Sequence, residues 1–406
     1  MGYTKDIIKG VSWISALRGI TRGLSFIRIL IIARLLTPSQ FGLFGVASLI
    51  LSFAEVFTET GVNIFLIQKK GNIDRYLNSL WIVSIMRGSI IALVILISAH
   101  FIASFFNAPN SLSLLLLISI VPLIRGFINP AIILFQKNLN FNKEFYFRST
   151  ILAVEVLVSV FLVYLLRSPT GLIFGMIASA IIEVVLSFII ISPRPKFKFE
   201  KVRFFEVFHA GKWITISTIF NYLYQNLDDM VVVRLLNTTS LGLYQMAYKI
   251  SMLPITEVSD VIAKVTFPIY SKIADDKARL RRAFLRTVSV NVVFAVPFVF
   301  IFLAFPSQII LILLGSEWVA AVSVLQILAV FGLTRAITVP AIIALLALKR
   351  QDIVAKITFA TLIILAVTVV PLVNSWGIFG AGLSATIASF IVLPFAYMYA
   401  LKYLKD

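Results

Sequence analysis

Long apolar stretches follow one another along the whole of this 406-residue chain, separated by short polar connectors. An apolar run of about 18 or more residues is long enough to cross a bilayer as a helix. The pattern therefore predicts an all-α polytopic membrane protein. Its twelve predicted transmembrane helices are residues 9–35, 41–67, 77–105, 112–136, 144–166, 171–192, 207–235, 241–268, 287–313, 319–347, 355–373 and 377–401.

The connectors alternate between strongly basic and nearly uncharged, which predicts the orientation of the chain. Basic residues occupy every second connector: Lys5, Lys9; Lys69, Lys70, Arg75; Lys137, Lys143, Arg148; Arg194, Lys196, Lys198, Lys201, Arg203; Lys272, Lys277, Arg279, Arg281, Arg282, Arg286; Lys349, Arg350, Lys356; Lys402, Lys405. Short loops with a Lys/Arg excess face the cytoplasm. We therefore expect both termini to be cytoplasmic.

The amino-acid composition narrows the class of protein further. Hydrophobic residues make up 60% of the chain, and its mean hydropathy is +1.00. The net charge of +18 is spread over alternating connectors, which favours contact with anionic membrane lipids over nucleic-acid binding. With no cysteine and only His100 and His209, we expect no disulfide, no metal site and no cofactor. Because arginines interrupt the first span, we expect it to be retained and not cleaved as a signal peptide.

The second half of the chain repeats the first. Residues 34–36 recur 200 positions later as 234–236, and Trp13 recurs as Trp213. At the same offset, Gly42-Leu43-Phe44 matches Gly242-Leu243-Tyr244. Six spans in each half give the halves the same orientation, so the repeat predicts two lobes related by a pseudo-twofold along the membrane normal, with a central cavity. The predicted boundaries are a six-helix lobe at 1–192, a basic cytoplasmic linker at 193–206 and a second six-helix lobe at 207–406.

Charged residues lie inside the predicted spans. The basic ones are Arg18, Arg22, Arg28, Arg87, Arg125, Lys212, Lys249, Lys264 and Arg335, and the acids include Glu55, Glu59, Glu155, Glu183, Asp228, Asp229, Glu257 and Asp260. Each charge at the bilayer centre costs roughly 2.5–3.5 kcal/mol. They must therefore face the protein interior, pair with each other, or extend to the interface.

The interior arginines are candidates for binding an anionic substrate. Arg18 and Arg22 are four residues apart and share one face of the first helix. Their partner is either Glu55 or Glu59, as a structural ion pair, or a negatively charged substrate, and we favour substrate for at least one arginine. Arg28 belongs to the same group.

Asn221, Gln225 and Asp228 form a polar face on the seventh span. Asn221 and Gln225 are candidate substrate contacts. For Asp228 and Asp229, two hypotheses stand side by side: a bridge to Arg28 or another interior arginine, or a coupling site for a transported proton or Na⁺. The i, i+4 pair Glu55 and Glu59 carries the same two alternatives.

Arg125 and Arg335 occupy equivalent places in the two halves, and each is followed five residues later by a proline, Pro130 and Pro340. A proline inside a helix frees a backbone carbonyl, which is tolerated next to protein or a water-filled cavity. We therefore expect both arginines to approach the central cavity from opposite sides. The alternative is that each is neutralised inside its own lobe, Arg125 for example by Glu155 or Glu183.

Three motifs resemble those of bacterial polysaccharide flippases, a branch of the multidrug/oligosaccharidyl-lipid/polysaccharide exporter superfamily. The resemblance rests on the junction Ala33-Arg34-Leu35-Leu36-Thr37-Pro38-Ser39-Gln40-Phe41-Gly42-Leu43-Phe44, on Asn226-Leu227-Asp228-Asp229 with the following Arg234-Leu235-Leu236, and on the turn Gly315-Ser316-Glu317-Trp318. It covers nearly the whole chain and looks closest to the O-antigen, colanic-acid and teichuronic-acid type of exporter. Many such members are longer by two C-terminal spans.

The resemblance implies a carrier in the bacterial cytoplasmic membrane that moves an oligosaccharide linked to undecaprenyl diphosphate by alternating access. A cationic cavity suits a diphosphate, because arginine binds phosphate with bidentate geometry. The nearest rival is a cation-coupled multidrug exporter of the same superfamily, which the interior arginines disfavour. A membrane-embedded glycan polymerase or glycosyltransferase is a further rival. Since the outside connectors are short and hold no nucleophile–base pair, we expect no catalytic residues and no enzyme activity.

Overall fold

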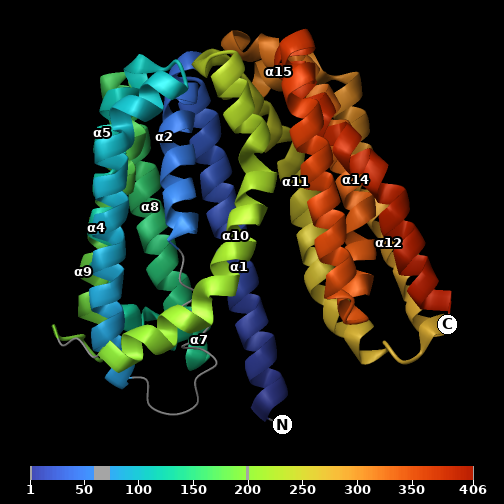
Figure 1. The fold of residues 1–406 in the computed structure, drawn as a ribbon, viewed down its shortest axis with the longest axis horizontal. Helices are drawn as coiled ribbons and strands as arrows, with labels where there is room; N and C mark the ends of the chain where they lie inside the picture. Colours follow the sequence, from blue (N-terminus) through green and yellow to red (C-terminus); the bar gives the residue numbers. More distant parts are fainter. Residues whose placement is uncertain (1, 59–73, 198–200, 406) are drawn as a thin grey trace. The chain divides into compact units, whose positions relative to one another are not determined.

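The computed structural model describes residues 2–58, 74–197 and 201–405, with backbone alone at 2–12, 14, 74–75, 201–217 and 405. All regular secondary structure in these ranges is helical (Figure 1). The chain divides into two compact units, Met1–Tyr222 and Leu223–Asp406. The division falls inside one long helix, α10 (Lys201–Leu235), which contributes to both units.

Unit 1 is built from long helices joined by short connections. Its elements before α10 are α1 (Gly2–Ala33), α2 (Pro38–Phe57), α4 (Asp74–Phe105), η1 (Pro109–Ser111), α5 (Leu112–Ile118), α6 (Ile120–Arg125), η2 (Pro130–Ile133), α7 (Leu134–Lys137), α8 (Phe141–Leu166) and α9 (Thr170–Ile190). Helix α8 packs along α9 and α1, and α6 packs along α4 and α9. Tyr222, at the end of the unit, donates its hydroxyl hydrogen to the carbonyl of Leu49 on α2 at 2.6 Å.

The junction motif at residues 33–44 has a clear local explanation. Thr37 caps α2: its hydroxyl accepts from the backbone N–H of Gln40 at 3.3 Å, and the Gln40 side chain accepts from the N–H of Thr37 at 3.1 Å. This reciprocal capping box satisfies two helix-end donors, and Pro38 is suited to the first helical position because it has no N–H to leave unpaired. The motif therefore fixes where α2 begins.

The predicted span 112–136 is not a continuous helix. The chain there is broken into α5, α6, η2 and α7, with a bend of 72° between residues 109–125 and 130–137. Asn129 is extended and caps η2, its side chain accepting from the N–H of Ala131 at 2.9 Å. Trp81 donates to the carbonyl of Phe127 at 3.0 Å. The break is stable because side chains take over the backbone hydrogen bonds that the helix gives up.

Helices α4 and α6 approach closely through two glycines. A side chain at Gly88 would collide with the carbonyl of Pro122, and one at Gly126 would meet the carbonyl of Ser84 at 2.9 Å. Small residues of this kind allow the backbones of membrane helices to touch. The contact holds the broken α6 segment against α4.

Unit 2 contains the C-terminal part of α10 and the elements α11 (Thr238–Lys272), α12 (Lys277–Ala304), α13 (Pro306–Leu313), η3 (Ser316–Ala321), α14 (Val322–Ala347) and α15 (Gln351–Lys405). Helix α14 packs against α15, α11 and α12 and is the most enclosed element of the unit. Asn237 caps α11, accepting from the N–H of Ser240 at 2.8 Å. This cap lies 200 residues after that of Thr37, so the repeat extends to local structure.

Helix α15 is two helices. Trp376 and Gly377 have non-helical backbone angles, and Gly377 has φ 57°. The break falls between the predicted spans 355–373 and 377–401. The predicted span 287–313 is likewise divided, between α12 and α13 at Phe305. In contrast, α14 continues through Pro340. The two prolines are therefore not equivalent, because Pro130 begins η2 after a break and Pro340 lies in an unbroken helix.

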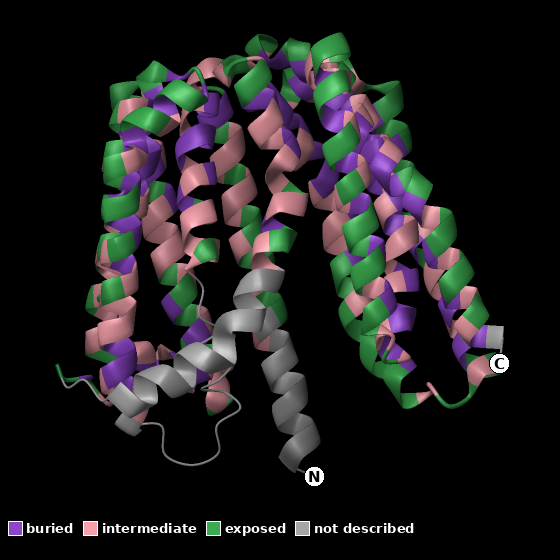
Figure 2. Ribbon diagram, in the orientation of Figure 1, coloured by how far each residue is buried: buried purple, intermediate pink, exposed green. Residues whose placement is uncertain are grey.

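Many large apolar residues are exposed, among them Ile97, Phe101, Leu157 and Val293, which are 68–75% exposed. Figure 2 shows exposed positions along the helices of both units. Among the described residues, seven helices are long and apolar enough to cross a membrane, or eight if the bent pair at 109–137 is one span. One of the seven is α15, which consists of two helices in succession. Helices α1, α10 and α11, each of which carries several charged residues, are not among them. The protein is therefore an all-helical, multi-pass membrane protein.

Candidate functional site

Three interior arginines of unit 1, Arg28, Arg87 and Arg125, contact acids, backbone carbonyls or a hydroxyl of the same unit. Arg28 on α1 forms an ion pair with Glu155 on α8. Arg87 on α4 donates to the carbonyl of Glu55 at 2.7 Å and to the hydroxyl of Thr58 at 3.0 Å. These contacts tie α1 to α8 and α4 to α2.

Arg125 lies between two carboxylates. It is the last residue of α6, and its guanidinium is 3.7 Å from Oε1 of Glu55 on α2 and 3.7 Å from Oε2 of Glu183 on α9. Glu183 is one of the partners expected if Arg125 were neutralised inside its own lobe. The expected approach of Arg125 and Arg335 to a central cavity stays a prediction.

Arg18 and Arg22 lie on successive turns of α1, Arg18 half-buried and Arg22 exposed. Among the described residues, Arg18 forms no ion pair within 4.0 Å. Of the acids expected as their partners, Glu55 lies beside Arg125, and Glu59 is outside the described residues. An anionic partner for Arg18 stays a prediction.

The polar face of α10 crosses the division between the units. Asn221 is exposed and belongs to unit 1, whereas Gln225 and Asp228 belong to unit 2. Asp228 is buried at 5% exposure, and the hydroxyl of Tyr244 on α11 donates to its Oδ2 at 2.5 Å. The neighbouring Asp229 accepts from the side chain of Gln245 at 2.8 Å. Both aspartates are therefore bound to α11 by neutral donors.

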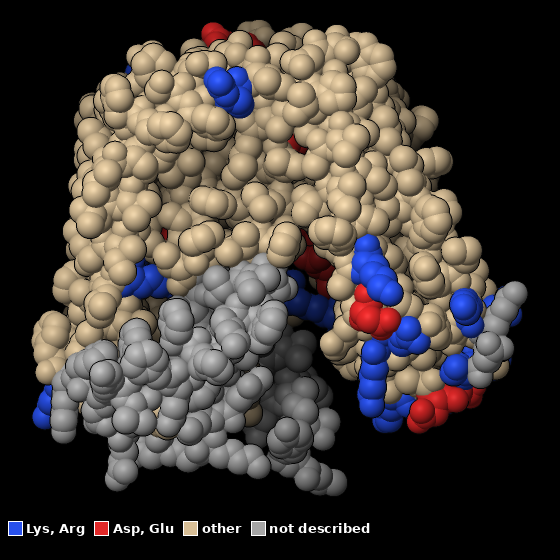
Figure 3. Space-filling view, viewed as in Figure 1, with Lys and Arg blue, Asp and Glu red and all other residues tan. Residues whose placement is uncertain are grey.

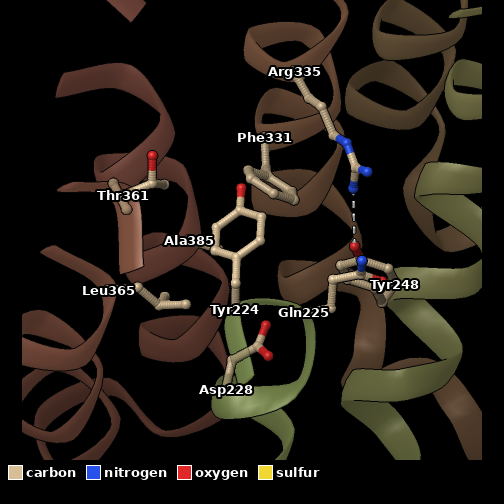
Figure 4. Close-up of a pocket in the computed structure, with 10 residues that line it drawn as sticks. Tyr224, Gln225, Asp228, Tyr248, Phe331, Arg335, Thr361, Leu365 and Ala385 are labelled. Carbon is tan, nitrogen blue, oxygen red and sulfur yellow. Dashed lines mark hydrogen bonds between the residues drawn. The ribbon is translucent and has the colours of Figure 1, made fainter. Parts of the chain in front are cut away.

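A small pocket opens beside Asp228 within unit 2 (Figure 4). Its wall consists of Tyr224, Gln225, Asp228, Tyr248, Phe331, Arg335, Thr361, Leu365, Ala385 and Ala388. Arg335 extends from α14 and donates to the hydroxyl of Tyr248 at 3.4 Å, a long contact. The pocket thus combines one acid, one cation and aromatic rings. Its tyrosines, Tyr224 and Tyr248, were missed by the sequence analysis. Tyr248 lies four residues after Tyr244, the partner of Asp228, so that this spacing could have pointed to a common face of α11.

Neither the ion pairs of unit 1 nor the pocket of unit 2 resembles a metal site. Within the ranges that the structure describes, no three His, Asp or Glu residues lie close enough together to hold a metal ion. At the end of unit 2 where α11 connects to α12, lysines and arginines gather in view (Figure 3). The exposed cations there include Lys272, Arg279, Arg281, Arg282 and Arg286, in agreement with a basic connector at a membrane surface.

Comparison with solved structures shows the fold. The lipid II flippase MurJ in an inward closed conformation matches with a TM-score of 0.73 and 17% identity, over 96% of this chain and 88% of that chain. A multidrug resistance MATE family transporter in an inward-facing conformation matches with a TM-score of 0.72 and 14% identity, over 96% and 95%. The arrangement of helices is therefore that of flippases and drug exporters.

Sequence comparison shows the family. The "Lipopolysaccharide biosynthesis protein WzxC" of Escherichia coli (strain K12) is 27% identical over 369 residues, 88% of this chain and 73% of that protein. The model of the family described as "Polysaccharide biosynthesis protein" matches residues 31–323, more than half of the chain. This chain therefore belongs to the polysaccharide biosynthesis protein family, a family of membrane flippases and not of enzymes.

Proposed function

We propose that this protein moves an oligosaccharide linked to undecaprenyl diphosphate from the cytoplasmic to the outer leaflet of a bacterial cytoplasmic membrane. The observation that carries the proposal is the family match over residues 31–323. The likeness in fold to a lipid II flippase supports it, since that protein is named for a lipid-linked substrate.

The proposed architecture is twelve transmembrane helices in two six-helix lobes, residues 1–192 and 207–406, joined by the basic linker 193–206. The lobes are related by a pseudo-twofold and enclose a central cavity that opens alternately to each side. Matching helix caps at Thr37 and Asn237, 200 residues apart, support the duplication. Both termini are cytoplasmic in this proposal because of the basic connectors.

The proposed substrate contacts are Arg18, Arg22, Arg28, Arg125 and Arg335, together with Asn221 and Gln225. Ion pairs already occupy Arg28 and Arg125, so the first contacts with a diphosphate are assigned to Arg18 in unit 1 and Arg335 in unit 2. Among the described residues, Arg335 has a long contact to a neutral hydroxyl and no ion pair within 4.0 Å, which leaves its charge available to an anion. Asp228, Asp229, Glu55 and Glu59 are the proposed coupling residues for H⁺ or Na⁺.

A cation-coupled multidrug exporter is the alternative, because the fold is shared with a drug exporter. The two functions differ in the charge of the substrate. Interior arginines attract a diphosphate and repel a cationic drug, and this favours the flippase.

The proposal is tested by glycan export in cells that depend on this protein. Arg18→Ala combined with Arg22→Ala should abolish surface glycan and leave lipid-linked precursor in the cytoplasmic leaflet. The matched control, Arg148→Ala with Arg167→Ala, removes the same charge from the same unit and should leave export intact. Arg148 lies in α8 and pairs with Glu144, and Arg167 follows the last residue of α8 and lies over the ring of Tyr164. Normal export by the Arg18/Arg22 variant at normal protein level would contradict the assignment.

A further inference from the structure

Three arginines follow one another along one exposed face of α12, and we call them the arginine row. Arg279, Arg282 and Arg286 are spaced by three and four residues, which places them on the same side of the helix. All three are exposed, and they lie at the end of unit 2 where cations gather in Figure 3. Since α12 packs against α11, α14 and α15, the row lies on the outer side of the unit.

The same face of α12 continues as an apolar surface. Val290 and Val293 lie four and seven residues after Arg286, and their exposed fractions are 37% and 68%. Residues 287–304 contain no Asp, Glu, Lys or Arg. These 18 residues of helix measure about 27 Å, close to the hydrocarbon thickness of a bilayer. Arg286 therefore stands at the boundary between the hydrocarbon and the headgroups.

The arginine row is long enough to cross the headgroup layer. From Arg286 to Arg279 the helix rises about 10 Å, at about 1.5 Å per residue. The polar layer on each side of a bilayer is roughly 5–8 Å thick. The three side chains therefore cover the level at which the phosphates of phospholipids lie.

The connections at this end of unit 2 carry an excess of positive charge. Residues 272–286 hold six cations and two acids, a net charge of +4. Earlier on α11, Asp260 and Lys264 cancel each other in charge, and the connector 349–356 adds three cations and one acid. These neighbouring segments therefore do not neutralise the arginine row.

Within the described ranges, the arginine row has no acidic partner. Asp276 caps α12, its carboxylate accepting from the backbone N–H of Arg279 at 2.9 Å. Nε of Arg282 donates to the carbonyl of Ala278 in its own helix at 3.4 Å, a long contact. No ion pair within 4.0 Å includes Arg279, Arg282 or Arg286. Guanidinium groups bind phosphate through two parallel hydrogen bonds, so the row is suited to a phosphate from outside the chain.

The first half of the sequence has no such row. Its third helix, α4, follows Lys69 and Lys70, but its own first ten residues hold one acid and one cation, Asp74 and Arg75. The first ten residues of α12, 277–286, hold five cations and no acid. An orientation signal alone does not require a row of arginines inside the helix.

We propose that the outer face of α12 binds one anionic phospholipid of the surrounding bilayer. Arg279, Arg282 and Arg286 hold its phosphate and its charged headgroup, and one acyl chain lies along Val290 and Val293. The ligand is a lipid and not a free anion, because the cationic and apolar parts form one continuous face. The site requires only that the chain spans a membrane, and it holds whichever substrate the protein transports.

The test is native mass spectrometry of the purified full chain, with phosphatidylglycerol or phosphatidylcholine added to the same detergent. The wild type should retain one phosphatidylglycerol more tightly than phosphatidylcholine, and inorganic phosphate should not displace it. Arg279→Gln combined with Arg282→Gln and Arg286→Gln should weaken the binding of that molecule by at least about tenfold. Equal retention of the two lipids, displacement by phosphate, or unchanged binding in the triple variant would overturn the proposal.

A matched control separates a defined site from diffuse attraction. Lys272→Gln with Lys277→Gln and Arg281→Gln removes the same charge from the same segment. Lys277 and Arg281 each lie two residues from Arg279, about half a turn around α12, so this variant should change the binding less than about twofold. A loss as large as that of the row variant would mean diffuse attraction and would refute the site. If the row variant fails to fold, Arg286→Gln against Arg281→Gln gives the same comparison, with an expected loss of about fivefold. Because no transport is measured, failure here is distinguishable from failure of the proposed flippase activity.

Discussion

The hydrogen bond between Tyr244 and Asp228 gives a quantitative test of how unit 2 holds its buried acid. Tyr244→Phe removes one hydroxyl group from a side chain that is 1% exposed, without changing the shape of the ring. It deprives Oδ2 of Asp228 of a donor at 2.5 Å. Hydrogen bonds to charged groups contribute about 1.5–3 kcal/mol, and because water does not reach the buried carboxylate easily, we expect the free energy of unfolding to fall by that amount.

A matched control lies in the same unit. The hydroxyl of Tyr397 donates to the carbonyl of Ile337 at 2.9 Å, a neutral acceptor whose hydrogen bonds contribute about 0.5–1.5 kcal/mol. Tyr397→Phe makes the same chemical change and should cost about 1 kcal/mol less than Tyr244→Phe. Equilibrium unfolding in mixed micelles, followed by tryptophan fluorescence, measures both losses.

A double-mutant cycle isolates the pair. In an Asp228→Asn background the partner is uncharged. Tyr244→Phe should therefore lower the free energy of unfolding by about 1 kcal/mol less than it does in the wild type. If the loss is the same in both backgrounds to within about 0.5 kcal/mol, the bond does not carry the assigned energy and the account of Asp228 is wrong.

Two further predictions concern the helix caps and the topology. Thr37→Ala removes the capping box of α2 and should destabilise the protein by about 0.5–2 kcal/mol, whereas Thr37→Ser keeps the hydroxyl and should be nearly neutral in the same unfolding measurement; equal effects would argue against the cap. Since the chain has no cysteine, single cysteines report topology without background. Cysteine at Asn110 or Asn237 should react with an impermeant thiol reagent from outside the cell, and cysteine at Lys277 should react only after permeabilisation; the reverse pattern would refute the proposed orientation.

The linear sequence determined those features that depend on one helix at a time. Apolar runs located the helices, including the division between 355–373 and 377–401 that the structure places at Trp376 and Gly377. The side chains of Thr37 and Asn237 cap α2 and α11 through local contacts and so determine where these helices begin. The charged residues inside the spans were also visible in the sequence, because a charge in an apolar run stands out without knowledge of its neighbours.

The tertiary structure decided how those charges are balanced. Arg28 pairs with Glu155, 127 residues away in the chain, and Asp228 is bound by Tyr244, whose hydroxyl gives no signal in a hydropathy pattern. The break within 112–136 is likewise tertiary, because Trp81 on α4 and Ser187 on α9 supply the hydrogen bonds that make it tolerable. Such contacts depend on which helix faces pack together. The period of a single helix states which residues share a face, but not what that face meets.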